Sequence, residues 1–285
     1  MSNPVFSNSP IFGDPRKQRK GQAGAVRTYG MAGVQTADAA ALENLYGAPS
    51  ATPVQMRRMT YDDVVVKTGG LLTLLVVVAV AAWYVTPQMP YLYLVGAVVG
   101  LVLGLVNVFR RTPSPALIVA YTVAEGVFLG GLSFLFQNFA VAQSSTGTAQ
   151  PIVLQAVLGT FVTFAAALLL FRSGKVRVTP KFTRWLLVAM VGYLGFSFLN
   201  FALSFFMPSS GFGPLRNGPI GIVAGLVAVG LAAASLIVDF DSIKRGVEQG
   251  VPAKFAWSAA FGLVVTLVWL YLELLRLFAI LSGRN

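Results

Sequence analysis

The sequence predicts an all-α membrane protein with seven transmembrane helices and a disordered N-terminal tail. Of its 285 residues, 56% are apolar and 11% are charged, whereas a soluble domain carries about 25% charged residues. From residue 68 onward, apolar runs recur with the length of about 20 residues that a helix needs to cross a hydrocarbon core. Lysine and arginine gather in alternate connections between these runs. Most of the chain is therefore expected to lie in lipid.

The first 60 residues differ from the rest of the chain. They are rich in Pro, Gly, Ala, Asn and Ser, and such a segment buries too little apolar surface to offset its conformational entropy. We expect a disordered tail over 1–60, with one short helix at 38–45, and a transmembrane domain over 61–285. The tail also holds a basic cluster, made of Arg16, Lys17, Arg19 and Lys20.

Each apolar run predicts one spanning helix. The breaks between runs carry Pro and Gly, as in TPQMP, RRTPSP and PSSGFGP, which are typical of turns. The predicted spans are 68–86, 91–109, 115–139, 152–171, 185–207, 220–243 and 257–281.

The distribution of Lys and Arg predicts the orientation, because cytoplasmic loops retain these residues. One side collects basic residues before the first span, between the second and third, between the fourth and fifth, and between the sixth and seventh. The opposite side has Arg216 as the single basic residue of its loops. We therefore expect a plasma-membrane protein with a cytoplasmic N-terminus. The net charge of +11 is explained by this topology and by attraction to anionic lipid, so no nucleic-acid partner is expected.

The composition excludes many kinds of enzyme. With neither histidine nor cysteine, the chain lacks the residues for a Ser-His-Asp relay, a thiol nucleophile, an imidazole metal site or an iron–sulfur cluster. No phosphate-binding loop accompanies the helices, which argues against an ATP-driven pump. We expect no enzymatic activity and no resident cofactor.

Small residues form stripes on two predicted helices. Gly96, Gly100 and Gly104 recur every four residues in the second, and the sixth carries Gly218, Gly221 and Gly225. Such stripes allow helix backbones to approach closely in lipid. They predict packing within the bundle, with dimerisation as the alternative.

Three of the acids inside the predicted spans stand out and need an explanation, because an ionisable residue at the centre of a bilayer costs about 2.5–3.5 kcal/mol on insertion scales. Glu125 lies ten residues into the third span, about 15 Å from its start. Asp239 lies in the sixth span and Glu273 in the seventh. Asp241 lies beside Lys244 and Arg245, and we interpret it as a solvated residue near the interface.

Asp239 and Glu273 have three possible roles: to share a proton, to bind a cation through their oxygens, or each to pair with a base. In the last case Arg276, three residues after Glu273 on the same helix face, neutralises Glu273. Arg110 and Arg111 at the end of the second span are typical topology anchors, although a long arginine side chain there also has the reach to approach a carboxylate.

The C-terminal third resembles a known family. The segment IVDFDSIK at 237–244, followed by WLYLELLRLF at 269–278, is similar to the paired signatures of the Bax inhibitor-1 family in its bacterial branch. Asp239, four residues before Ile243, and Glu273, directly after Leu-Tyr-Leu, match the two family acids. Arg110, eleven residues before Tyr121, matches a family arginine. The resemblance covers roughly residues 57–283.

The resemblance implies six helices around a central seventh helix and a pH-sensitive calcium leak channel. In the family the two acids form the sensor and share a proton in the closed state, and the arginine stabilises that state. Asp239 and Glu273 would then also meet the calcium ion. Bacterial relatives are in addition described as modulators of a membrane-bound protease.

Two functional hypotheses follow from the sequence. The first is a cation leak gated by Asp239 and Glu273, with Arg110 stabilising the closed form and Glu125 as a candidate lining residue of the pathway. The second is a regulatory membrane protein whose basic tail engages a protease or another partner. An intramembrane aspartyl protease is a weaker third hypothesis, because the Gly-x-Gly-Asp motif is missing.

Overall fold

The computed structural model describes residues 57–143, 151–176, 178–207 and 213–282. The predicted disordered tail and the short helix expected at 38–45 lie outside these ranges. Within them the regular structure is helical, apart from an isolated antiparallel bridge between Arg58 and Pro252, and turns and short irregular segments connect the helices.

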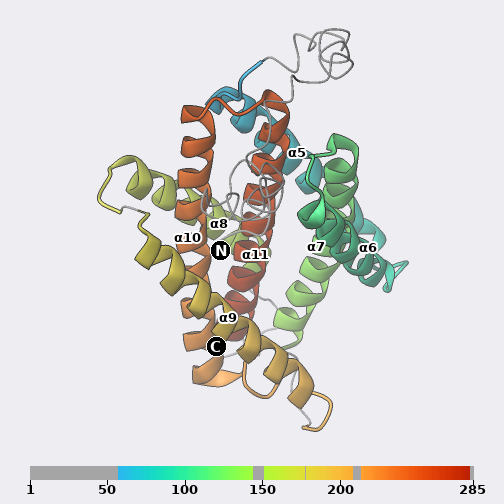
Figure 1. Ribbon diagram of the computed structural model, residues 1–285. Helices are drawn as coiled ribbons and strands as arrows, with labels where there is room; N and C mark the ends of the chain where they lie inside the picture. The colour runs from blue at the N-terminus through green and yellow to red at the C-terminus, as the bar shows by residue number, and fades with distance from the viewer. Residues whose placement is uncertain (1–56, 144–150, 177, 208–212, 283–285) are drawn as a thin grey trace, which may run out of the picture.

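Seven helices are long and apolar enough to cross a membrane, as predicted (Figure 1). A short 3₁₀ turn, η2 (Ala253–Phe255), precedes the last of them. The helices are α5 (Tyr61–Val85), α6 (Leu92–Phe109), α7 (Pro115–Gln143), α8 (Ile152–Arg172), α9 (Pro180–Leu203), α10 (Gly218–Glu248) and α11 (Ala256–Ser282).

Several helices extend beyond the apolar runs that predicted them. α5 begins at Tyr61 rather than at residue 68, because Thr60 and Asp63 form a capping box that satisfies the first backbone N–H groups. α9 begins at Pro180 rather than at 185, because Thr179 caps it and Pro180 occupies its first turn. Hydropathy marks the part of a helix suited to lipid, whereas caps decide where the helix starts.

Helix α11 is the central element of the bundle. It packs against α5, α7, α8 and α10, and its buried residues lie on several faces along nearly its whole length. α6 is attached mainly through α7, and α9 through α10. The predicted central seventh helix is therefore confirmed, with α6 and α9 at the periphery.

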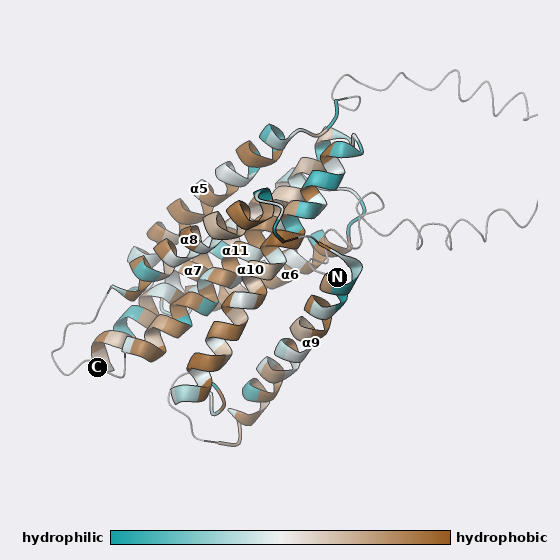
Figure 2. Ribbon diagram, turned by 90° about the vertical axis from the view of Figure 1, so that its left-hand side faces the viewer, coloured by the Kyte–Doolittle hydropathy of each residue, from teal (hydrophilic) through white to brown (hydrophobic). Residues whose placement is uncertain are grey.

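The outer faces of the bundle are apolar. Val188 and Phe198 on α9, for example, are 68% and 70% exposed, and hydrophobic colour runs along much of the helices (Figure 2). In water such a surface would drive association, whereas in a bilayer lipid covers it.

Both glycine stripes face neighbouring helices, as predicted. A Cβ atom added to Gly96 would lie 2.8 Å from the backbone nitrogen of Phe128 on α7. A Cβ atom added to Gly225 would lie 3.1 Å from Leu277 Cδ1 on α11. The stripes therefore set close helix–helix approaches within one chain.

The start of α5 is fastened to the connection between α10 and α11. The Met59 N–H donates to the Val251 carbonyl at 2.7 Å, and the Ala253 N–H donates to the Arg57 carbonyl at 2.7 Å. Gly250 allows the turn because its φ is +66°. We call this the basic end of the bundle, where α5 and α11 begin and α10 ends, and we call the opposite end the Arg216 end.

Candidate functional site

Asp239 lies at the interface between α10 and α11. Its side chain is 0% exposed, and its Oδ2 accepts a hydrogen bond of 2.7 Å from the Thr266 hydroxyl on α11. Nine residues separate it from the end of α10 at Glu248, which is about 14 Å along the helix. The acid is thus deep within the bundle, in the half toward the basic end.

Glu273 has a different set of partners. Its Oε2 forms an ion pair with Arg276 on the next turn of α11. Its Oε1 accepts hydrogen bonds from the Tyr193 hydroxyl on α9 and from Trp269 Nε1 at 3.3 Å. Glu273 is 4% exposed, so this is a buried ion pair.

Arg216 completes this group from the connection that precedes α10. Its Nη2 donates to the Tyr193 hydroxyl at 2.8 Å and also to the Ser197 hydroxyl. Arg276 Nη2 donates to the same Tyr193 oxygen at 3.0 Å. The phenol therefore joins both guanidinium groups to the carboxylate, and we call Tyr193, Ser197, Arg216, Glu273 and Arg276 the Tyr193 cluster.

The two acids lie on different helices and contact α11 at different depths. Thr266 and Glu273 are seven residues apart, which is two turns of α11, or about 10 Å, and places them on the same side of the helix. Each acid has its own partners: Asp239 has Thr266, and Glu273 has the Tyr193 cluster. The alternative in which Arg276 neutralises Glu273 is seen directly, whereas a proton shared between the two acids stays a prediction.

Arg110 is not brought to either acid. It lies exposed at the end of α6, where its backbone N–H donates to the Val106 carbonyl at 3.1 Å. α6 packs on α7, so this arginine is on the periphery of the bundle. The proposed latch between Arg110 and the acids is therefore not formed in this structure.

Glu125 belongs to the α6–α7 pair rather than to the α10–α11 interface. A Cβ atom added to Gly100 would lie 3.0 Å from Glu125 Oε1, so the glycine makes room for the carboxylate. Oε2 of Glu125 is buried and accepts no hydrogen bond within the described part of the chain. The structure thus separates this acid from Asp239 and Glu273.

The contacts of Asp241 agree with its interpretation as a residue near the interface. Its Oδ2 pairs with Arg245 at 3.0 Å, one turn further along α10, and both side chains are partly exposed.

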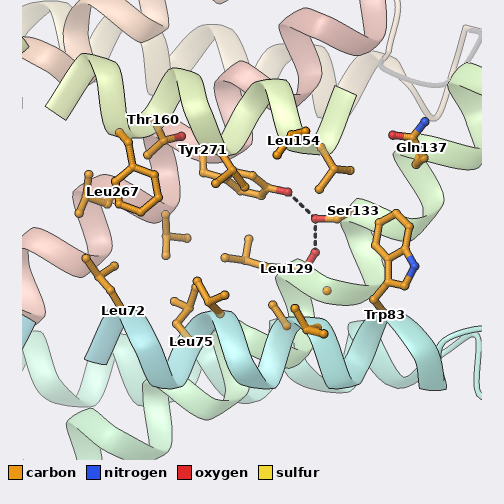
Figure 3. Close-up of a pocket in the computed structure, with 18 of the residues that line it drawn as sticks. Leu72, Leu75, Trp83, Leu129, Ser133, Gln137, Leu154, Thr160, Leu267 and Tyr271 are labelled. Carbon is orange, nitrogen blue, oxygen red and sulfur yellow. Dashed lines mark hydrogen bonds between the residues drawn. The ribbon is translucent and has the colours of Figure 1, made fainter. Parts of the chain in front are cut away.

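Two cavities flank α11. The larger, of about 630 Å³, lies between α5, α7, α8 and α11, and Figure 3 shows the Tyr271 hydroxyl reaching Ser133 at its edge. None of the described residues that line it is charged, so it is unsuited to guide an ion. The smaller, of about 430 Å³, is lined by residues of α9 and α11 together with Arg216, and so adjoins the Tyr193 cluster.

The described residues contain no group of three or more acidic side chains arranged to hold a metal ion. Calcium normally takes six to eight oxygen ligands, so a binding role for Asp239 and Glu273 applies to a transported ion in passage and stays a prediction. The alternative regulatory role rests on residues 1–56, outside the described ranges, and also stays a prediction.

Sequence reasoning missed Thr266 and Tyr193 as partners of the acids. A lone threonine or tyrosine in an apolar helix carries no signal of its own, because its partner lies on another helix. Arg216 did carry a signal, as the single basic residue in the loops of its side, yet its inward direction follows only from the fold.

Comparison with known proteins agrees with the resemblance carried by the two helix signatures. A search of curated proteins found no match. The family model described as Bax inhibitor 1 like matches residues 3–283, which is nearly the whole chain and includes all seven helices. The chain is therefore a member of the Bax inhibitor 1 like family.

Proposed function

We propose that this protein is a pH-sensitive leak channel for cations, calcium among them, with Asp239 as its protonation-sensitive group. The full burial of Asp239 between α10 and α11 carries the proposal. A carboxyl group inside a membrane bundle is costly to keep and marks a functional site by default. Its described hydrogen-bond donor, Thr266, is a neutral hydroxyl that suits both protonation states, since it donates to either and accepts from the protonated form.

The α10–α11 interface supports a route along α11. Carboxylate oxygens occur at two depths along α11, those of Asp239 beside Thr266 and those of Glu273 two turns further on, and oxygen atoms are the ligands that hard cations prefer. Between these depths lie Leu236 of α10 and Leu270 of α11, both 0% exposed and part of one apolar cluster. We assign these two leucines to an apolar constriction of the proposed route, which would be shut in this conformation.

The direction of the pH dependence follows from burial. When Asp239 loses its proton, a full negative charge lies at a fully buried position between α10 and α11, and the entry of water or a cation would stabilise that charge. Ionisation therefore favours an open interface, and we expect flux to rise with pH. In the Tyr193 cluster Glu273 connects α9 and α11, and we assign it the role of a structural tie rather than that of the sensor.

The direct test is calcium flux from proteoliposomes over a range of pH. The wild type is expected to show flux that increases with pH, and Asp239→Asn is expected to remove that dependence. The matched control is Asp241→Asn, two residues away but paired with Arg245 near the interface, which should retain it. Wild-type flux equal to that of empty vesicles, or an unchanged pH profile in Asp239→Asn, would contradict the proposal.

We further assign the protein to the plasma membrane, with the basic end and the N-terminus in the cytoplasm, because Lys and Arg gather at that end. The chain has no cysteine, so a single cysteine can be introduced either at the basic end or at the Arg216 end of the bundle. Labelling of each variant on intact cells with a membrane-impermeant reagent tests the orientation. Labelling at the basic end alone would contradict it.

A further inference from the structure

The smaller cavity forms a groove with one polar and one apolar end. Its polar end is made by Tyr193, Ser197, Arg216 and Glu273. Its apolar end runs along α9 through Leu187, Met190, Val191 and Leu194. We call this cavity the α9 groove.

The charges at the polar end do not balance. Two guanidinium groups belong to the Tyr193 cluster but only one carboxylate does: Arg276 pairs directly with Glu273, and Arg216 is connected to Glu273 through the Tyr193 hydroxyl. Arg216 is 9% exposed, and the buried Nε–H groups of both arginines donate to no acceptor in the described part of the chain. A buried excess of one positive charge is costly without a counterion, so the site favours an anionic group.

The apolar end fits a hydrocarbon chain. Leu187, Val191 and Leu194 have the spacing of one helix face, and the last two are 61% and 68% exposed on the outer surface of α9. The groove therefore opens toward lipid. Ten residues of α9 separate Ser197 from Leu187, so the apolar end extends about 15 Å into the membrane from the polar end.

From this combination we propose that the α9 groove binds an anionic phospholipid of the leaflet at the Arg216 end. The phosphate accepts hydrogen bonds from Arg216, and one acyl chain lies along α9. Arginine suits this role because its planar fork of N–H groups matches phosphate oxygens. An anionic lipid neutralises the buried excess charge, whereas a zwitterionic lipid brings its own cation into the groove. This inference does not depend on the leak function.

Trp269 provides a reporter because it lines the groove. The full-length chain with Trp83, Trp185 and Trp257 replaced by Phe retains Trp269 as its single tryptophan. Its fluorescence is measured in vesicles that contain phosphatidylglycerol or phosphatidylcholine with brominated acyl chains, which quench on contact. We expect the relative binding constant for phosphatidylglycerol to be about fivefold higher, the size expected for one basic residue near an anionic lipid.

Arg216→Gln in this background is expected to remove the preference. The matched control is Arg184→Gln, because Arg184 lies exposed on α9 near the basic end and its loss should leave the preference unchanged. Arg216→Lys keeps the charge without the planar fork and should retain part of it. Circular dichroism on each variant identifies any that fails to fold.

The single-tryptophan reporter with Arg216 intact tests the proposal by itself. Equal quenching by the two brominated lipids at equal mole fraction would overturn it. Inorganic phosphate in the buffer separates a lipid from a free anion: loss of lipid quenching at millimolar phosphate would show that the groove takes free phosphate and would also overturn the lipid proposal. Unchanged quenching would support it.

Discussion

Asp239 and Glu273 are both buried acids on long apolar helices, yet their surroundings differ. Asp239 accepts a hydrogen bond from the neutral hydroxyl of Thr266. Glu273 is paired with Arg276 and, through the Tyr193 hydroxyl, is connected to Arg216. Two acids of similar burial thus differ in their contacts. Asp239 is part of an interhelical hydrogen bond in one half of the bundle, and Glu273 is part of a charged network in the other half. The role of a buried acid in a spanning helix therefore depends on the groups that it contacts.

The largest effect is expected from Arg276→Ala, because it leaves the buried Glu273 without its ion-pair partner. Removing one member of a buried pair typically costs about 3–5 kcal/mol. The measurement is the free energy of unfolding in mild detergent. The double variant Arg276→Ala with Glu273→Gln should recover much of the lost stability. A loss in Arg276→Ala alone that is smaller than the loss in Thr266→Val would contradict the difference between the two sites.

A smaller loss is expected from Tyr193→Phe, which removes the hydroxyl that joins two guanidinium groups to a carboxylate. Hydrogen bonds to charged groups contribute about 1.5–3 kcal/mol. Tyr271→Phe is the matched control, because the Tyr271 hydroxyl bonds to the neutral Ser133 and should cost about 0.5–1.5 kcal/mol. Equal losses in thermal denaturation would show that the charged network adds nothing beyond an ordinary hydroxyl pair.

Thr266→Val tests the hydrogen bond between Thr266 and Asp239. It keeps the shape of the side chain and removes the donor to Asp239, with an expected cost of about 1 kcal/mol when the acid is protonated. The cost should grow with rising pH, because a hydrogen bond to a carboxylate is the stronger one. Unfolding at several pH values, with Asp239→Asn as background, provides the test. A pH-independent cost would contradict a titrating Asp239.

The smallest effect is expected from Arg110→Ala. Its side chain is exposed at the end of α6, away from both acids, so neither stability nor the pH profile of flux should change. The same proteoliposome assay provides the measurement, with Arg111→Ala as its neighbouring control. Raised flux at low pH in Arg110→Ala, but not in Arg111→Ala, would support the latch that the family resemblance implies. Arg110 would then have to contact the acids in a second conformation.

Much of the fold was predictable because the bilayer imposes a simple rule on sequence. Each spanning helix needs an apolar run of fixed length, so seven runs predicted seven helices. The ends were less predictable: Thr60 and Thr179 set the starts of α5 and α9 several residues before the apolar runs. The glycine stripes were also correctly interpreted as packing faces, because a missing side chain has the same steric meaning in any context.

The candidate site was predictable in part. Burial of Asp239 and Glu273 followed from their position in apolar runs, and Arg276 was recognisable as a partner of Glu273 from its spacing on one helix. Tyr193 and Arg216 were not, because Tyr193 reaches Glu273 from another helix and Arg216 joins through Tyr193 from a connection. Both lie 57 or more residues earlier in the chain. Arg110 was expected near the acids, and its place on the peripheral α6 shows that a family motif does not fix side-chain contacts.

The sequence by itself determined the class of protein, the number of helices and the presence of acids in lipid, because hydropathy and length act locally along the chain. Tertiary structure alone decided which groups from other helices meet those acids, and it placed Thr266, the partner of Asp239, two turns of α11 away from Glu273. The physical reason is that partners of a buried charge are chosen by helix rotation and depth, and packing among all the helices sets both.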